Sequence, residues 1–278
     1  MFSIIWKIWK TKMKAGYYMQ DDYGNVTLVN VSGIYDEQPL FIDKLKKGGA
    51  GVIDAVSMTG TNGYCDDMAK ENFREMMKEH AAKGIHFIDG GNYHYLTLLW
   101  LSLIEEPFDL IVFDNHSDMQ KPAFGDVLSC GGWIRNLVGD SGFKGKVTVV
   151  GVDKDNIDKE MKELGVKFIT KQTILKKRGQ QYGLENELID KCWTGKRPVY
   201  ISVDKDVLDE KEYKTNWNQG IMSVDELFAI IEDTFEMRKV IGMDICGEMD
   251  EAVNSEFGSI YNEINQAVNM RFLKFRIS

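Results

Sequence analysis

Short apolar runs alternate with longer helical patterns along the whole chain of 278 residues. The runs are rich in β-branched residues and have the length of buried strands. About eight such strands alternating with helices predict a parallel sheet that is covered by helices on both faces. A closed barrel and an open sheet both satisfy this pattern. We predict strands over Val26–Val31, Gly51–Val56, His86–Asp89, Asp109–Asp114, Val147–Val152, Val166–Ile169, Val199–Val203 and Val240–Ile245.

Capping and stop signals mark two of the helices between these strands. A helix over Asp66–Ala82 has apolar residues at helical spacing and is followed by Lys83-Gly84, a typical C-terminal stop. Ser223 precedes another apolar-periodic segment, and Glu226 three residues later completes a capping box. Further helices are predicted over residues 94–105, 156–163, 184–192 and 258–272.

We expect one large domain over residues 21–278, preceded by an N-terminal extension over residues 1–20. A hydrophobic fraction of 44% is enough to build a substantial core in a chain of this length. The segment MFSIIWKIWK at the start of the chain is apolar, but Lys7 and Lys10 interrupt it and it is too short to span a bilayer. No stable membrane insertion is therefore expected.

Charge and cysteine usage exclude other classes of protein. The formal net charge is −9, which argues against nucleic-acid binding because that function needs a clustered basic face. The four cysteines lie far apart without a C-x-x-C pair, so neither a disulfide framework nor a thiolate zinc site is predicted, and a cytoplasmic location is favoured. Cys130 and Cys246 are predicted to be structural, since neither has a neighbouring histidine in the sequence.

Two of the predicted strands end in acidic motifs. The first motif contains Asp114, His116 and Asp118 at alternate positions, so their side chains can converge, and the second contains Asp204 and Asp206. Carboxylates with an imidazole are the ligands expected for a divalent ion such as Mn²⁺. For either motif alone, a polar loop that caps the next helix explains the acids equally well. Both motifs at carboxyl ends of strands in one sheet favour the metal site, because four aspartates crowded without a cation would repel one another.

A third strand, IHFIDGG, leads to His94 at the start of the next helix. A histidine in such a place more often lies at the surface or caps a helix. The neighbouring acidic motifs favour a ligand role for His94 instead. The loop that follows the second strand offers Tyr64 and Asp67 to the same edge of the sheet, although a turn with Asp66 as helix N-cap explains this loop as well.

These motifs resemble those of the ureohydrolase family, which contains arginase, agmatinase and formimidoylglutamase. FDNHSD resembles the family segment D-A-H-x-D, and SVDKDVLD resembles S-x-D-x-D-x-x-D-P. DGGNYHY and GIMSVDEL resemble the G-G-D-H and G-G-L-T/S-x-x-E segments. The chain is identified as an atypical member. The resemblance implies a single three-layer α/β/α domain with a mostly parallel, about eight-stranded sheet, as in arginases and deacetylases.

The resemblance also implies a site for two Mn²⁺ ions per chain. A hydroxide that bridges the ions would cleave a C–N bond of a small cationic guanidino, amidino or formimino substrate. Asp118 would pass a proton to the departing amine. Family members commonly assemble, so a homo-oligomer is also expected. One ion would be bound by His94, Asp114, Asp118 and Asp204, and the other by Asp114, His116, Asp204 and Asp206.

The chain departs from the family pattern in three places. His94 stands one residue later than the family histidine, which leaves Asn92 or a water as alternative ligands. The stretch 128–133 lacks the histidine that serves arginases as a proton shuttle. The late acid of the D-x-x-E segment is also one residue later, as Glu248, which is predicted to bind the cationic group of the substrate.

Two other functions fit parts of this pattern. A single-metal deacetylase on the same fold would use a histidine pair as base, but the chain has no adjacent pair and retains Asp118 and Asp206, which only a second metal requires. A catalytically silent, metal-binding regulatory protein would explain the missing shuttle histidine and the displaced glutamate. The two-metal hydrolase accounts for most of the motifs.

Overall fold

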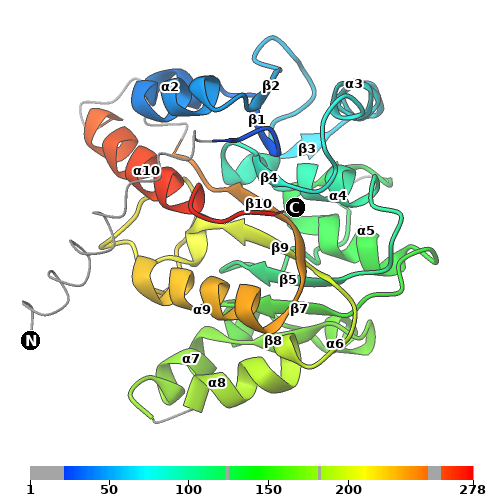
Figure 1. Ribbon diagram of the computed structural model, residues 1–278. Coiled ribbons are helices and arrows are strands. Elements are labelled where there is room, and N and C mark those ends of the chain that lie inside the picture. The colour runs from blue at the N-terminus through cyan, green and yellow to red at the C-terminus, as the bar shows by residue number, and fades with distance from the viewer. Residues whose placement is uncertain (1–21, 123–124, 181–182, 250–257, 278) are drawn as a thin grey trace, which may run out of the picture.

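The computed structural model of the chain describes residues 22–122, 125–180, 183–249 and 258–277. Within these ranges, eight parallel strands form one open sheet in the order β2-β1-β4-β10-β9-β5-β7-β8 (Figure 1). The open sheet excludes the closed barrel, and all eight predicted strands are confirmed. Their bounds are β1 Val26–Asn30, β2 Gly51–Asp54, β4 Ile85–Phe87, β5 Asp109–Phe113, β7 Val147–Val150, β8 Lys167–Ile169, β9 Val199–Asp204 and β10 Val240–Cys246.

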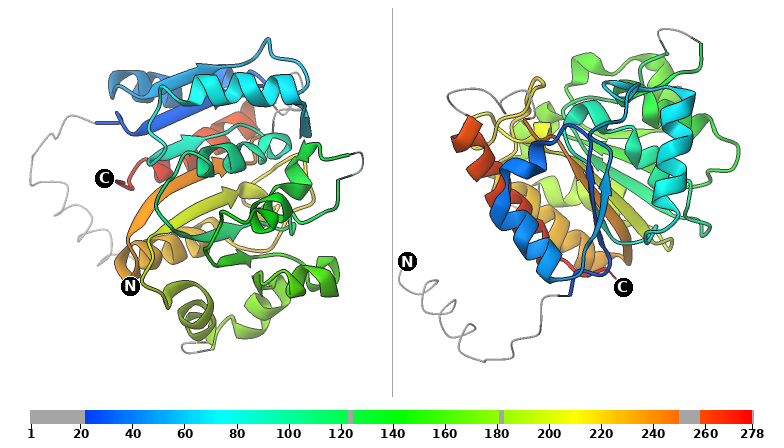
Figure 2. Two further views of the ribbon diagram at one scale, coloured as in Figure 1. Left: turned by 90° about the vertical axis from the view of Figure 1, so that its right-hand side faces the viewer. Right: turned by 90° about the horizontal axis from the view of Figure 1, so that it is seen from above.

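Helices cover both faces of this sheet, which gives the predicted three layers (Figure 2). Each face packs against its own hydrophobic cluster, because the central strands are apolar on both sides. One face carries α2 (Pro39–Lys47), α7 (Lys171–Lys177), α8 (Gly183–Leu188), α9 (Val224–Met237) and α10 (Gly258–Phe272). The other face carries α3 (Asp67–Met77), α4 (Leu96–Leu101), α5 (Trp133–Gly139) and α6 (Lys159–Glu163).

Short helical turns join several of these elements. The 3₁₀ turns are η1 (Ile34–Glu37), η2 (Gly91–Tyr93), η3 (Cys130–Gly132), η4 (Lys154–Asn156) and η6 (Lys205–Val207), and η5 (Ile189–Trp193) is a π turn. A small antiparallel sheet joins β3 (Tyr64–Cys65) to β6 (Leu128–Ser129). It brings the loop after β2 beside the loop after β5, at the edge where the parallel strands end.

Helix boundaries agree with the sequence where capping groups define them. The capping box of Ser223 and Glu226 opens α9 as predicted, and α10 spans the predicted residues 258–272. Asp66 caps α3 through the backbone N–H of Ala69. That helix ends at Met77, however, earlier than the predicted Ala82, because residues after it form turns ahead of β4.

The other predicted helices are shorter in the structure or are divided. The helix expected over residues 94–105 is reduced to α4, and the one over 184–192 is divided between α8 and η5. In the described part of the chain, no helix is long and apolar enough to cross a membrane. The N-terminal extension predicted over residues 1–20 lies outside the described residues.

Candidate metal centre and active site

Four neighbouring strands deliver polar side chains to one edge of the sheet. In the order β4-β10-β9-β5, the ends of these strands and the segments that follow them contain His94, Cys246, Asp204 with Asp206, and the motif from Asp114 to Asp118. Parallel strands place their carboxyl ends at the same edge, so segments far apart in the sequence meet there. All of these side chains are buried except that of His116, which is 25% exposed.

His94 lies at the centre of a first group of acids. Its Nδ1 is 2.9 Å from a carboxylate oxygen of Asp118, 3.4 Å from one of Asp114 and 3.7 Å from one of Asp204. Its Nε2 lies 2.9 Å from the hydroxyl oxygen of Ser202, which donates a 2.6 Å hydrogen bond to Asp244. The contact with Ser202 fixes the imidazole so that Nδ1 faces the carboxylates.

A second group adjoins the first through Asp114. The Nδ1 of His116 lies 2.7 Å from an oxygen of Asp206 and 3.6 Å from Asp114 Oδ1. The turn is held by the backbone N–H of Asn115, which donates to Asp206, and by that of His116, which donates to Asp114. Asp114 belongs to both groups, since its Oδ2 is the oxygen near His94 and its Oδ1 the one near His116.

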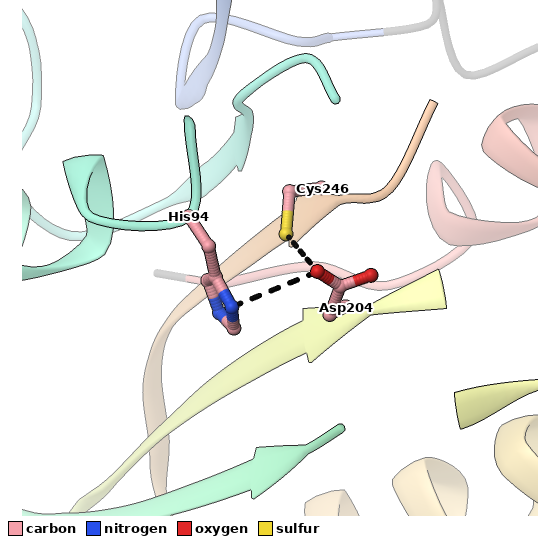
Figure 3. Close-up of side chains that lie close together, drawn as sticks. All are labelled: His94, Asp204 and Cys246. Carbon is pink, nitrogen blue, oxygen red and sulfur yellow. Dashed lines mark hydrogen bonds and ion pairs between the residues drawn. The ribbon is translucent and has the colours of Figure 1, made fainter. Parts of the chain in front are cut away.

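Cys246 forms a third group with two of these residues (Figure 3). Its Sγ donates a 3.3 Å hydrogen bond to Asp204 Oδ2, the same oxygen that lies 3.7 Å from His94 Nδ1. Cys246 is the last residue of β10 and is the register partner of Asp204 on β9. Cys246 has no histidine close to it in the sequence, but the fold brings His94 near it in space.

The pKa shifts of the clustered residues indicate that negative charge is concentrated there. Burial, and next the neighbouring carboxylates, raise the pKa of Asp204 to about 7 and that of Asp206 to about 6. Burial opposes protonation of His116, but Asp114 and Asp206 outweigh it and raise the imidazole pKa to about 12. Burial also opposes protonation of His94, whose pKa is nevertheless raised by Cys246, Asp114 and Asp118. A cation in the cluster would relieve this repulsion.

Two buried atoms at the centre of the cluster indicate that the residues fit a metal. Among the described residues, His94 Nδ1 and Asp114 Oδ2 form no hydrogen bond, although both are buried and face one another across 3.4 Å; the 2.9 Å contact of Nδ1 with Asp118 is an ion-pair distance without hydrogen-bond geometry. Buried polar atoms are normally satisfied, so such a pair needs an explanation. Imidazole nitrogens and carboxylate oxygens that converge in this way are suited to divalent ions.

The structure separates the two alternatives at the first motif. Asn92 lies outside the cluster: its amide nitrogen donates to Asn62, and its oxygen accepts from the indole N–H of Trp217. His94 occupies the position among the acids. His94 directly follows the short turn η2, and its imidazole reaches the edge of the sheet.

Asp118 is held in place by its backbone and by one aromatic side chain. Its φ of 48° is in the left-handed region, which few residues other than glycine adopt. The indole N–H of Trp133 donates a 2.7 Å hydrogen bond to Asp118 Oδ2. Trp133 is fully buried and was not singled out from the sequence, because an apolar tryptophan in a helix resembles any core residue.

Glu248 does not lie where its predicted role requires. Its carboxylate is buried and pairs with the ammonium of Lys205, while Gln38 and Asn269 donate hydrogen bonds to it at 2.9 and 2.7 Å. The negative charge of this carboxylate is already paired with the Lys205 ammonium, and both of its oxygens accept hydrogen bonds. These contacts disagree with the prediction that Glu248 binds the cationic group of the substrate. The buried Lys205 at 0% exposure is the partner that the sequence did not reveal.

A pocket of about 610 Å³ opens above the cluster. Its lining includes His116, Asp118, Asp204 and Asp206 on the side of the cluster. The remaining walls include Tyr64, Lys121, Val127, Ser129, Cys130 and Trp217. Tyr64 therefore contributes to the pocket as one of the sequence alternatives proposed, whereas Asp67 pairs with Lys70 on α3 instead.

Comparison with known proteins agrees with this architecture. A Thermotoga maritima protein described as an uncharacterized protein is 29% identical over 226 residues, which are 81% of this chain and 80% of that protein. Formimidoylglutamase from Bacillus subtilis has a similar structure, with a TM-score of 0.65, 16% identity and coverage of 90% of this chain and 85% of that one. Proclavaminate amidino hydrolase from Streptomyces clavuligerus is also similar, with a TM-score of 0.64, 17% identity and coverage of 90% of this chain and 90% of that one.

The family itself follows from the sequence. The model of the Arginase family matches residues 25–249, a range that contains every strand of the sheet and all three groups at its edge. The chain therefore belongs to the arginase family, whose members are metal-dependent hydrolases of guanidino and amidino C–N bonds.

Proposed function

We propose that this protein is a binuclear metal-dependent hydrolase that cleaves a C–N bond of a small guanidino, amidino or formimino compound. The observation that carries the proposal is the pair of ligand groups that share Asp114 on the lining side of the pocket. Structural neighbours described as formimidoylglutamase and proclavaminate amidino hydrolase support the reaction class. A cytoplasmic location and a homo-oligomeric state stay predictions.

The residues at the edge of the sheet would hold two divalent ions. We assign one ion to His94, Asp114, Asp118 and Asp204, and the other to Asp114, His116, Asp204 and Asp206. This donor set is mainly of carboxylate oxygens and imidazole nitrogens, which supports Mn²⁺, above all for the group of Asp114, His116 and Asp206. Two bound ions would supply a strong nucleophile from water at neutral pH and would polarise the substrate.

The chain's own residues would place the substrate and handle the proton. The Asp118 carboxylate lines the pocket and is oriented by Trp133, so it can carry a proton to the departing amine. Tyr64 and Trp217 offer aromatic walls on which a planar cationic group can stack. Since Glu248 is paired with Lys205, recognition of the cation falls to the pocket lining.

Metal analysis of the Mn²⁺-loaded protein tests the site. We expect about two ions per chain for the wild type and for Asp126→Ala, an exposed control near the same loop, because the two-metal site is intact in both. Asp114→Ala should retain neither ion, since its carboxylate would serve both. Retention of both ions by Asp114→Ala overturns the ligand assignment, and a single ion in the wild type favours the deacetylase alternative.

Release of urea or ammonia tests the reaction. The loaded protein is incubated with arginine, agmatine, guanidinobutyrate, guanidine and formiminoglutamate, and we expect turnover of at least one of them. Asp118→Asn should retain its fold and lose most of that turnover. Complete inactivity of the fully loaded protein across the panel moves the assignment to a catalytically silent, metal-binding protein.

A further inference from the structure

The thiol of Cys246 lies where a metal ligand would lie. It is fully buried at the end of β10, and its sulfur, a nitrogen of His94 and an oxygen of Asp204 all lie within 4.8 Å of one another (Figure 3). The His94 nitrogen in this group is the buried Nδ1 that has no hydrogen-bond partner among the described residues. A buried thiol, an imidazole nitrogen that makes no hydrogen bond and a carboxylate oxygen thus face a common point.

We propose that Cys246 is a sulfur ligand of one of the two ions and that the group of His94, Asp204 and Cys246 selects a thiophilic divalent ion such as Zn²⁺, Co²⁺ or Fe²⁺. The inference rests on the proposed metal-dependent function and narrows it. The group of Asp114, His116 and Asp206 contains only oxygen and nitrogen donors. The two positions therefore differ in the ion that each prefers.

The distances within the group agree with a shared ion. Bonds of about 2.3 Å to sulfur and about 2.0 Å to nitrogen or oxygen place tetrahedral ligand atoms roughly 3.3–3.6 Å apart. Cys246 Sγ is 3.3 Å from Asp204 Oδ2, and that oxygen is 3.7 Å from His94 Nδ1. Ordinary side-chain adjustments would bring all three to one ion.

The chemistry of a thiolate explains the selectivity. Thiolates are soft ligands that favour zinc, cobalt and iron over manganese, whereas carboxylates favour hard ions. When the ion binds, the thiol proton leaves to solvent and the S–H hydrogen bond to Asp204 is replaced by ligand bonds to the metal. The thiolate also adds one negative charge, which a divalent cation compensates in this buried place.

The other cysteines provide an internal comparison. Cys65 and Cys192 are buried in the two hydrophobic clusters, and neither belongs to a metal-ligand group among the described residues. Cys130 lines the pocket and is likewise outside these groups. Of the four cysteines, only Cys246 is the register partner of an aspartate at a strand end, Asp204. The position of its sulfur beside the carboxylates therefore follows from the pairing of β9 with β10.

Cobalt spectroscopy tests the proposal independently of catalysis. The full chain is stripped with a chelator and loaded with Co²⁺, and the bound cobalt is counted by equilibrium dialysis. We expect a near-ultraviolet charge-transfer band from thiolate to cobalt. Cys246→Ser should lose the band, whereas Cys130→Ser, which removes the thiol nearest to the pocket, should retain it.

A metal competition supplies a second measurement that does not depend on the serine variant folding. Zinc binds most sites more tightly than manganese, so the change between variants is the informative quantity. In equimolar Zn²⁺ and Mn²⁺, Cys246→Asp should lower the ratio of bound zinc to bound manganese by about tenfold or more, because it replaces sulfur by oxygen.

The outcomes distinguish this inference from the proposed function. If the wild type binds about two Co²⁺ ions without a thiolate band, Cys246 is not a ligand and the metal-dependent function stands. A band that survives in Cys246→Ser, or an unchanged zinc-to-manganese ratio in Cys246→Asp, overturns the inference in the same way. A wild type that retains no metal overturns both.

Discussion

The side chain of Lys205 lies in a buried polar cluster although its neighbours in the sequence, Asp204 and Asp206, belong to the metal groups. Its ammonium pairs with Glu248, donates a 3.0 Å hydrogen bond to Asn269 Oδ1 and lies 5.1 Å from the ring centre of Tyr213. The pair locks the start of η6 to the end of β10. An ion pair of this kind is costly to break, because one charge then stays buried alone.

Removal of one partner should therefore destabilise the protein strongly. We expect Lys205→Met to lose about 3–5 kcal/mol of unfolding free energy, measured by denaturant titration, and the double variant Lys205→Met/Glu248→Gln to regain part of it. Lys47→Ala breaks the exposed pair with Asp43 and serves as control, with a loss of about 0–1 kcal/mol. A double variant that is no more stable than Lys205→Met contradicts the pairing argument.

His86 makes the unfolding free energy depend on pH. Burial lowers the pKa of His86 to about 4 from the ordinary value of 6.5, and the ring stacks on Trp100 with ring centres 3.9 Å apart. The unfolded chain thus binds a proton more readily than the folded one. The stabilisation is complete above pH 6.5 and is lost as the pH falls towards about 4, by about 3 kcal/mol in all.

The variant His86→Gln separates the contribution of His86 from the titration of the acidic groups. It should be less stable than the wild type at neutral pH, because it loses the stacking on Trp100, and the difference should shrink as the pH is lowered from 7 to 4. Parallel stability curves over that range would show that His86 titrates with the same pKa in the folded and unfolded chains, which contradicts the burial argument.

Residue types at fixed spacing predicted which side chains converge at the candidate site but not the partners of these side chains. Asp114, His116, Asp118, Asp204 and Asp206 meet as expected, since alternation along an extended segment and the common edge of parallel strands are local rules. Long-range pairing decided the rest. The ion pair of Glu248 joins residues 43 positions apart, and the approach of Cys246 to His94 joins the end of β10 to the turn that follows β4; no sequence spacing indicates either.

Among the elements, the end of β10 shows how backbone shape controls the site. Gly247 follows Cys246 with a φ of 91°, and a Cβ there would lie 2.6 Å from Asp204 Oδ1 and 2.8 Å from the backbone nitrogen of Lys205. The strand can turn away only because this residue has no side chain. The metal groups therefore need a glycine at this position.

We expect Gly247→Ala to lose metal affinity as well as stability. Gly165→Ala is the matched control, because its φ of 83° imposes a similar backbone cost while nothing lies within 4 Å of the added methyl group. Gly165→Ala should lose about 1–2 kcal/mol of unfolding free energy from its positive φ, and Gly247→Ala should lose more because of the added clash. Only Gly247→Ala should bind metal at least about tenfold more weakly in calorimetry. Equal metal affinities in the two variants contradict the steric argument.

Prediction of elements succeeded where local signals are strong. The strands are short apolar runs between turns, and α9 has both a capping box and an apolar face, so each could be located from the sequence. The helix α4 is entirely apolar apart from Thr97, which leaves no polar face to mark its end. Small helices such as α5 are stabilised by packing against the sheet, and their own sequences carry little signal.

At the scale of the whole molecule, the ligands connect both halves of the sheet. The two hydrophobic clusters lie on opposite faces of the same strands, and Trp100 and Trp133 belong to one cluster while Trp193 belongs to the other. The metal groups join the ends of β9 and β10 to the segments that follow β4 and β5. We propose that residues 21–278 form a single domain, which should unfold as one unit despite its size.

Metal binding should then stabilise the entire sheet together. Because ions bind the folded state, at a metal concentration of about 100 times Kd the unfolding free energy should rise by about 2.7 kcal/mol over the chelator-treated protein. Far-ultraviolet circular dichroism and tryptophan fluorescence should report the same single transition before and after the shift, since the strands that hold the ligands also carry both clusters.

Asp114→Ala should fold with the same single transition and show no shift on metal addition. Two separate transitions, or a shift seen by one probe alone, would mean that the ligand-bearing strands and the rest of the chain unfold independently, and the single-domain proposal would fail.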